Sequence, residues 1–499
     1  MKLEYELSPT WPPLAWVAEC RAPGATVHVR HGSRVETHEC WFAEAVWDGA
    51  FDRGEFDRTD LVFGSGGRVR DGALVFVPSG APVDRIQFAE RDGGAVVSNS
   101  IAALAEAVGA HVDPCFTGWY DFFGSIRFGI QSYSRPIPTS DPELRLCYHH
   151  NLRWQGERLE ETAKPNPRQD FSSYAAYRRF LVETAEALTR NLADPARRHR
   201  IQNLATLSTG YDSPAVAAIL REVGVDRAVT MDRSRDGQPD DGAEIGDILG
   251  YDTERFSSDA WRDGELLEAP FFAADAKGQD IVLAGAGRHL EGTLLWTGFQ
   301  GGYAWDAYPP VVETEMRRRD RSGLSLSEYR LWSGFLHLPM PFLGLRQMPD
   351  IHAITRSDEM QAFSVPGKYD KPIARRILEE AGVPRESFGM EKKAAACMFA
   401  RGRETITEEA KQDLHRWLEA QAEAWTARGR RRPQSFRRTM ERLGPLHSLG
   451  VRLTRTLARG PLFSTFERLS DRLEDLRTHY RLAFPWALDR ARRRYRLDQ

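Results

Sequence analysis

The alternation of apolar and polar positions divides the middle of the chain into short strands and amphipathic helices. Apolar and β-branched runs predict buried strands at 202–207, 227–231 and 253–256. A helix is predicted from Pro214, a residue that suits a first helical turn, to Gly224, and a second helix from Asp240-Asp241 to Gly250. Strands and helices that alternate in this way predict a parallel sheet with right-handed crossovers.

The pattern before this segment is richer in strands. Turns are predicted at 64–67 and 70–72, and strands at 73–77 and 95–97. Ser100 is expected to cap a helix over 101–108 that ends at Gly109. The N-terminal third therefore predicts a β-rich unit.

Two breaks in the pattern predict three domains. Residues 161–170 contain two prolines and no apolar period, so they are predicted to be a linker. An amphipathic helix with a serine cap is predicted to follow, over 174–192. From residue 401 onward the pattern is helical and rich in arginine. The predicted domains span 1–165, 170–400 and 401–499.

Composition narrows the class of protein. Among 499 residues, 41% are hydrophobic and 28% charged, which is typical of a globular chain. No run of 18 apolar residues is present, so no membrane partner is expected. Five widely spaced cysteines and an acidic start that differs from a signal peptide favour the cytoplasm.

The net charge of −3 conceals a basic tail. Residues 401–499 contain 23 lysines and arginines against 13 acidic residues. Because acids alternate with the arginines, a solvated helical face explains the tail better than an anionic partner does. A nucleic-acid partner is therefore not expected.

The stretch Ser208–Ser213 lies between a predicted buried strand and a helix start, where open parallel sheets bind ligands. Small residues at a helix N-terminus form an anion cradle, and the hydroxyls of Ser208 and Ser213 can add donors to phosphate oxygens. Asp212 would repel a phosphate unless it holds a divalent cation. The alternative is an ordinary strand-to-helix turn with a Ser or Asp cap.

Three stretches resemble a known family. Ser208-Thr209-Gly210-Tyr211-Asp212-Ser213 resembles the Ser-Gly-Gly-x-Asp-Ser loop of the N-type ATP pyrophosphatases. Thr297–Tyr303 resembles the second Gly-rich loop of their asparagine synthetase branch, which is usually Ser-Gly-Glu-Gly-x-Asp. The late helix and lysine loop of that branch resemble 369–376, 382–385 and 388–393. The order of these stretches after a β-rich unit matches the branch, and the resemblance covers roughly residues 60–400.

The resemblance implies an α/β fold with a β-rich, Ntn-hydrolase-like N-terminal domain, a parallel HUP-like nucleotide-binding synthetase domain and a helical C-terminal extension. It implies a ligase that adenylates a carboxylate with ATP and Mg²⁺, releases pyrophosphate, and transfers the acyl group to an amine or ammonia with release of AMP. Mg²⁺ on Asp212 and a lysine, Lys392 or Lys393, would neutralise the leaving pyrophosphate. The implied nucleotide contacts are Ser208, Thr209, Gly210, Tyr211, Asp212, Ser213, Met231, Thr297, Gly298 and Gly301.

The chain also departs from the family pattern. Residue 2 is Lys where a glutamine-hydrolysing asparagine synthetase has a nucleophilic Cys, so the N-terminal domain is not expected to release ammonia from glutamine. Phe299 stands where Glu is usual and Gly302 where a metal-binding Asp is usual, although Asp306 is close enough in sequence to substitute.

These departures leave alternatives open. One is a non-catalytic scaffold that binds a nucleotide or a partner, and another is a lasso-cyclase-like ligase that tailors a peptide or natural product. The expected substrates are a small-molecule or peptide carboxylate, aspartate among them, and an amine. The oligomeric state is open, with a homodimer as one option.

Overall fold

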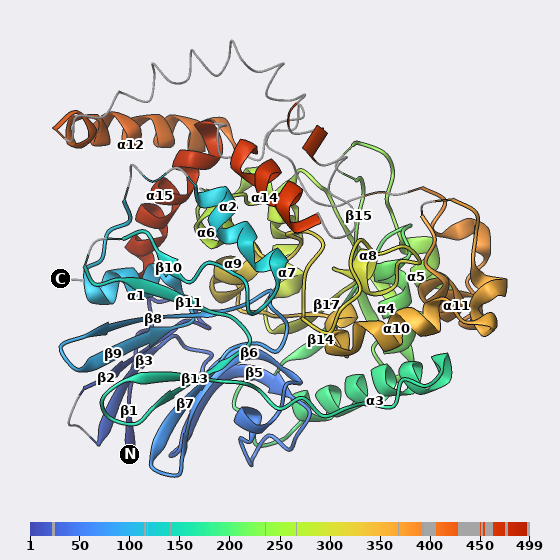
Figure 1. Cartoon of the computed structure of the whole chain (residues 1–499), viewed down its shortest axis with the longest axis horizontal. Coiled ribbons are helices and arrows are strands. Elements are labelled where there is room, and N and C mark those ends of the chain that lie inside the picture. Colours follow the sequence, from blue (N-terminus) through green and yellow to red (C-terminus); the bar gives the residue numbers. More distant parts are fainter. Residues whose placement is uncertain are drawn as a thin grey trace.

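The structure is a computed structural model of the whole chain (Figure 1). It describes residues 1–21, 25–113, 116, 118–139, 141–234, 236–265, 267–367, 369–391, 393, 406–427, 450, 453–454, 463–474 and 478–496. The architecture is mixed α/β, with a β-rich N-terminal region, a parallel sheet flanked by helices, and further helices toward the C-terminus.

The N-terminal region contains two sheets packed face to face (Figure 1). Its strands are β1 (Lys2–Leu7), β2 (Trp16–Cys20), β3 (Thr26–His31), β4 (Glu36–Thr37), β5 (Trp41–Trp47), β6 (Val62–Arg70), β7 (Ala73–Val77), β8 (Ile86–Arg91), β9 (Gly94–Ser98), β10 (Pro136–Ile137), β11 (Leu144–Cys147), β12 (Asn151–Trp154) and β13 (Leu159–Thr162). The sheets run β1-β3-β2-β9-β8-β11-β10 and β13-β12-β7-β6-β5-β4. Trp16 of the first sheet packs on Phe42 and Phe76 of the second, with ring centroids 5.1 and 6.1 Å away.

The predicted turn at 64–67 is wrong, because these residues run through strand β6. A Cβ at Gly64 would lie 2.0 Å from the carbonyl oxygen of Glu44, and one at Gly66 would lie 2.3 Å from that of Phe42. The glycines therefore serve a close approach of β6 to its neighbour β5, which is the other use that strands make of glycine. The predicted turn at Asp71-Gly72 is confirmed.

The helices predicted at 101–108, 174–192, 214–224 and 240–250 are present, among others that the sequence pattern did not predict. The described helices are α1 (Ile101–Val108), α2 (Trp119–Gly124), α3 (Tyr174–Leu192), α4 (Asp212–Glu222), α5 (Ala243–Leu249), α6 (Glu268–Asp275), α7 (Gly287–Leu290), α8 (Gly301–Ala304), α9 (Leu326–Ser333), α10 (Met348–Thr355), α11 (Pro372–Glu380), α12 (Glu408–Ala427), α14 (Phe463–Glu474) and α15 (Thr478–Arg492). Ser100 caps α1 by accepting a hydrogen bond from the backbone N–H of Ala103, and Gly109 ends it in the left-handed conformation. Helix α5 begins at Ala243, two residues after the predicted start.

A five-stranded sheet forms the centre of the α/β region. Its strands are β14 (Gln202–Leu207), β15 (Arg227–Met231), β16 (Asp252–Phe256), β17 (Thr293–Thr297) and β18 (Leu336–Pro339). All pairings are parallel, in the order β16-β15-β14-β17-β18, as the strand–helix alternation predicts. After β14 the chain adds β15 and β16 on one side of it, and then β17 and β18 on the other side. The sheet therefore has a topological switch point between β14 and β17.

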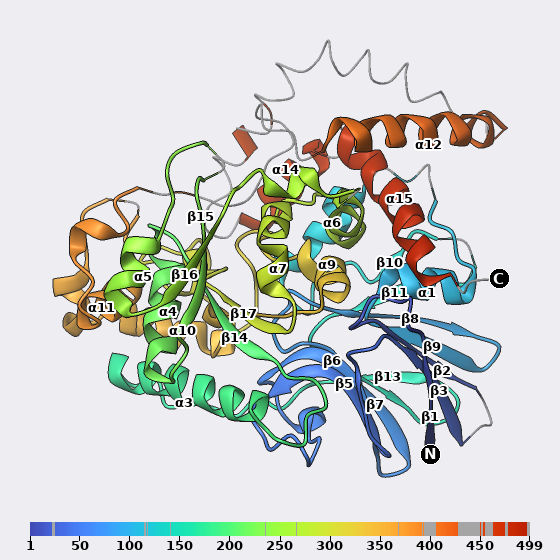
Figure 2. The same ribbon diagram turned by 180° about the vertical axis from the view of Figure 1, so that it is seen from behind.

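Helices cover both faces of this sheet. Helices α3 and α4 cover one face, and α6, α7 and α9 cover the other (Figure 2). Neighbouring residues of one strand accordingly belong to different cores: Ala205 packs toward α4, and Leu204 packs toward α7 and α9.

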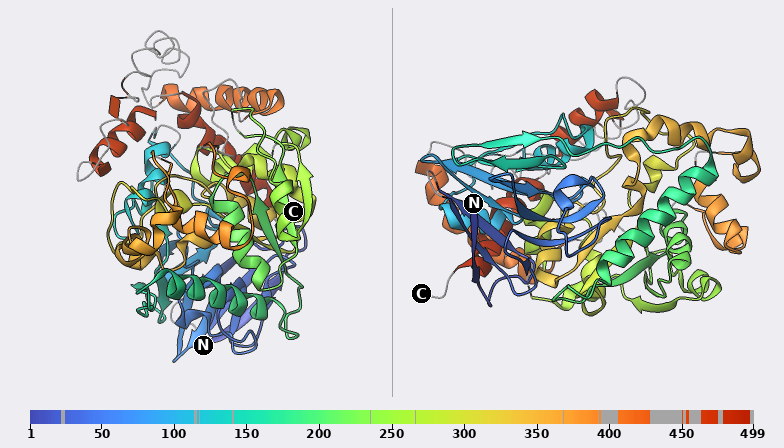
Figure 3. Two further views of the ribbon diagram at one scale, coloured as in Figure 1. Left: turned by 90° about the vertical axis from the view of Figure 1, so that its right-hand side faces the viewer. Right: turned by 90° about the horizontal axis from the view of Figure 1, so that it is seen from below.

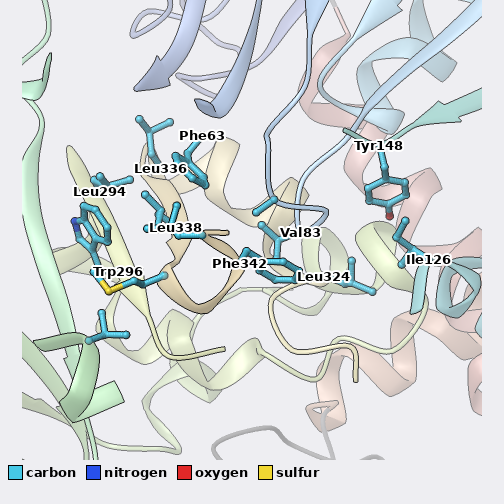
Figure 4. Close-up of a cluster of buried hydrophobic side chains, with 14 of the residues drawn as sticks. Phe63, Val83, Ile126, Tyr148, Leu294, Trp296, Leu324, Leu336, Leu338 and Phe342 are labelled. Carbon is cyan, nitrogen blue, oxygen red and sulfur yellow. The ribbon is translucent and has the colours of Figure 1, made fainter. Parts of the chain in front are cut away.

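The β-rich and α/β regions share one hydrophobic core (Figure 4). Phe63 of β6 and Val83 lie in the same cluster as Leu336 and Leu338 of β18. The shared core means that the two regions are packed as one body.

A buried ion network joins the same two regions. The guanidinium of Arg330, on α9, donates to both oxygens of Glu44 over 2.6 and 3.1 Å, and its Nε lies 2.9 Å from Asp84. All three side chains are 2% exposed or less. Burial raises the pKa of Glu44, which the guanidinium opposes.

The described C-terminal helices lie on the body at the end away from the N-terminus (Figure 3, left). Arginines of α15 pair with acids: Arg490 with Asp413 of α12 and Arg492 with Glu106 of α1, over 2.5 and 2.9 Å. The hydroxyl of Tyr495 donates to the buried carboxylate of Glu328 over 2.7 Å. These described arginines of the basic tail are therefore bound within the protein. Within the described ranges, every helix falls short of the length or apolar content needed to cross a bilayer.

Candidate functional site

Two glycine-rich loops meet at the switch point of the parallel sheet. Residues 208–211 follow β14, and residues 298–300 follow its neighbour β17. A Cβ at Gly298 would lie 2.4 Å from the backbone nitrogen of Ser213, and one at Gly301 would lie 2.3 Å from the carboxyl carbon of Asp212. Glycine is therefore required at 298 and 301 so that the second loop can lie against the first turn of α4.

Asp212 begins helix α4 and forms an ion pair with Lys371. The ammonium lies 2.5 Å from Asp212 Oδ2, and the Lys371 side chain is 4% exposed against 23% for Asp212. Lys371 is the N-cap of α11, directly before Pro372. A cation at a helix N-terminus opposes the helix dipole, so the nearby carboxylate offsets an unfavourable placement.

The first loop is held by its own side chains. Asp240 accepts hydrogen bonds from the backbone N–H and hydroxyl of Thr209, over 3.1 and 2.8 Å. Burial raises the pKa of Asp240, and these hydrogen bonds and Lys393 oppose the rise. The ammonium of Lys393 donates to the Thr209 hydroxyl over 3.0 Å and to the carbonyl of Pro239 over 2.7 Å. The N–H of Gly210 donates to Ser208 Oγ over 3.2 Å, so two amides of the predicted anion cradle already have partners.

The ring of Tyr211 anchors the loop in the core. The side chain is buried, with Tyr369 and Phe388 rings 4.9 and 5.7 Å away. Arg375 donates to its hydroxyl. Gly389, at φ +67, packs on the ring, where a Cβ would lie 2.3 Å away, and its N–H donates to the first loop. Because its side chain is buried, Tyr211 can contact a ligand only through its backbone.

The second loop is fixed by a different set of contacts. Gln300 adopts a left-handed conformation, at φ +70, and its amide nitrogen donates to Asp320 over 2.8 Å. Arg319 donates to the carbonyl of Gly302 and to Asp306, each over 2.7 Å. The carboxylate of Asp306, suggested above as a substitute metal ligand, is thus ion-paired with a guanidinium.

Phe299 and Thr297 pack on the same histidine. The ring of Phe299 lies 5.6 Å from that of His337, edge to face, and the hydroxyl of Thr297 lies 3.0 Å from its Nε2. Burial lowers the pKa of His337 to about 3, so the imidazole is neutral. Thr297, at the end of β17, and Phe299, in the second loop, therefore contact a buried neutral histidine.

The remaining predicted residues have varied positions. Ser208 and Ser213 are half-buried at the loop, and Met231 is buried at the end of β15. Lys392 lies outside the described residues. Lys2 is exposed on β1, where its ammonium pairs with Glu4 over 2.9 Å.

Three residues of the site were missed as functional by sequence reasoning. Lys371 and Asp240 bond to the first loop, and a Cβ at Gly242 would lie 2.5 Å from the N–H nitrogen of Ser208. The sequence signal that could have led to Lys371 was Asp212, because a carboxylate at a buried loop needs a cation nearby. Nothing local marks Asp240 or Gly242.

Metal-ligand types are not clustered in the part of the chain that the structure describes: no group of three His, Cys, Asp or Glu side chains there could hold a metal ion. Comparison with other proteins adds no family: no family model matches the chain, and no curated protein matches it.

Proposed function

We propose that this chain is an ATP-dependent carbon–nitrogen ligase of asparagine synthetase type. It would adenylate a carboxylate, release pyrophosphate, and transfer the acyl group to an amine or ammonia with release of AMP. The proposal includes the finer fold assignment, an Ntn-hydrolase-like N-terminal domain and a HUP-like synthetase domain, since the strand order of the parallel sheet and the two stacked sheets suit both.

One observation carries the proposal. The two loops that resemble the family's Gly-rich loops follow adjacent strands and touch each other, although about 90 residues separate them in sequence. The third resembling stretch brings Lys371 there from its segment 369–376, and Gly389 and Lys393 from its segment 388–393. The three stretches chosen by resemblance thus meet in one region of the structure.

The residues around the two loops suit the binding of a polyphosphate. The N-terminus of α4 favours an anion through its dipole and amides. Lys371 supplies positive charge beside Asp212 and Lys393 beside Thr209, and Ser208 and Ser213 supply hydroxyls. In the proposed reaction, Lys393 neutralises charge on the pyrophosphate as it leaves, and the fixed loops hold the carboxylate substrate and nucleotide in line.

Mg²⁺ is the proposed counter-ion of the nucleotide and would contribute further positive charge at the phosphates. The protein side of such a site fits poorly at Asp212, because Lys371 already occupies one of its oxygens. We therefore assign no step of the reaction to a metal ion held by Asp212.

The test is pyrophosphate exchange into ATP, measured with the full chain across panels of carboxylates, aspartate included. Exchange that depends on one class of carboxylate supports the proposal, and amide formation with an amine panel identifies the second substrate. Lys393→Met should lower the exchange rate about tenfold or more. The control, Lys411→Met on α12, should leave it unchanged, since Lys411 pairs with Glu408 away from the loops.

A second candidate is a non-catalytic nucleotide-binding scaffold. It is favoured by the ion pairing of both loop carboxylates, Asp212 with Lys371 and Asp306 with Arg319. Tight ATP binding without exchange on any carboxylate would select the scaffold. Amide formation with a peptide substrate would select the lasso-cyclase-like alternative.

A further inference from the structure

The cation beside the first loop is part of the protein itself. Lys371 Nζ lies 2.5 Å from Asp212 Oδ2, and the Lys371 side chain is 4% exposed. Mg²⁺ requires near-octahedral oxygen ligands at about 2.1 Å, so it could not share this oxygen without displacing the ammonium. Asp306, the residue close in sequence to the second loop, is paired with Arg319. Two of the carboxylates at the loops, Asp212 and Asp306, are therefore already paired with cations that the protein itself supplies.

The ammonium also faces the second loop. A Cβ at Gly302 would meet one neighbour within 4 Å, the Lys371 ammonium at 3.7 Å. The position that a side chain at 302 would take is thus otherwise open, and it lies beside the Lys371 ammonium. Lys371 is 4% exposed and pairs with Asp212, and a bound anion would give its ammonium a second partner of opposite charge.

We infer that Lys371 fills the position of a loop-bound metal ion and contacts the phosphates of the nucleotide. This inference rests on the proposed nucleotide site and specifies its electrostatics. The nucleotide then binds these loops without any metal ion held by the protein, and Asp212 serves to position the ammonium.

Calorimetric titration of the full chain with ATP, in EDTA and in Mg²⁺, tests the inference. We expect ATP to bind the unmodified chain in EDTA. Lys371→Met should weaken binding about tenfold or more in both buffers, as expected for loss of a charge-assisted hydrogen bond. Thermal unfolding of each variant reports whether the fold is kept.

A double variant separates phosphate contact from a merely structural ion pair. Lys371→Met alone removes the ammonium that lies on Asp212 Oδ2, whereas Asp212→Asn with Lys371→Met removes both charges. If Lys371 contacts phosphate, the double variant still binds ATP weakly although its thermal stability recovers. If Lys371 only neutralises Asp212, the double variant recovers ATP binding, and the inference is overturned.

Gly302→Asp is the converse variant. It adds a second carboxylate beside Lys371 and should make ATP binding dependent on Mg²⁺. Binding by the unmodified chain only in Mg²⁺, with no effect of Lys371→Met, would overturn the inference and leave the proposed function standing. Absence of ATP binding in both buffers would overturn the proposed function itself.

Discussion

Replacement of Arg330 by Met should destabilise the protein far more than a typical surface change. The variant leaves Glu44 and Asp84, which are 0% and 2% exposed, without the guanidinium that lies 2.6 and 2.9 Å from them. Removal of one partner from a buried ion pair costs about 3–5 kcal/mol. The unfolding entropy is about 2 cal/mol/K per residue, so over the whole chain this corresponds to a fall in Tm of about 3–5 °C.

Scanning calorimetry and urea unfolding would measure this loss. The matched control is Arg190→Met on α3, because Arg190 pairs with Glu186 at the surface, with side chains 65% and 57% exposed. Exposed pairs of this kind contribute about 0.5 kcal/mol or less.

The way in which the stability loss of Arg330→Met changes with pH tests this reasoning. Burial already raises the pKa of Glu44, and loss of the guanidinium should raise it further. The unfolded state then releases a proton that the folded state retains, so the stability deficit of Arg330→Met should be small near pH 4 and grow as the pH rises to 7. A deficit that equals the control, or that does not change with pH, would refute the reasoning.

Three further predictions concern other parts of the chain. Gly389→Ala should weaken ATP binding more than Gly382→Ala in a titration, since both glycines have positive φ but only at 389 would the Cβ meet an aromatic ring, 2.3 Å away. Tyr495→Phe should cost about 1–3 kcal/mol in urea unfolding because it removes one of the two hydroxyls, those of Tyr495 and Ser100, that donate to the buried carboxylate of Glu328, whereas Tyr308→Phe, with Tyr308 62% exposed, should cost little. Burial lowers the pKa of Lys164 to about 7, so the unfolded state binds the extra proton above that pH; the stability of the unmodified chain relative to Lys164→Met should therefore rise between pH 7 and about 10.

Local signals predicted local structure well. The bounds of α1 and α3 follow from a serine cap and, for α1, a glycine stop, each within a few residues of the helix it limits. Strands β14 and β15 were predicted with their bounds because each is a short apolar run between turn residues. The parallel order of the sheet followed from their alternation with helices.

Contacts between distant segments were not predictable in this way. Glu44 and Arg330 are 286 residues apart, and each alone resembles an ordinary surface charge. The glycines of β6 were mistaken for a turn because only the neighbouring strand shows why they are small. At the site, resemblance identified the two loops and Lys393, but the pairing of Lys371 with Asp212 required the fold.

The contacts that hold the Tyr211 ring have a consequence for the rate at which a ligand binds. Its ring is held by Tyr369, Phe388, Arg375 and Gly389, so the first loop has its conformation before any ligand arrives. Binding then loses little backbone entropy, and association need not wait for a loop to close. A nucleotide at this site would therefore associate at a rate set by diffusion and charge, and its residence time would respond most to changes in the loops.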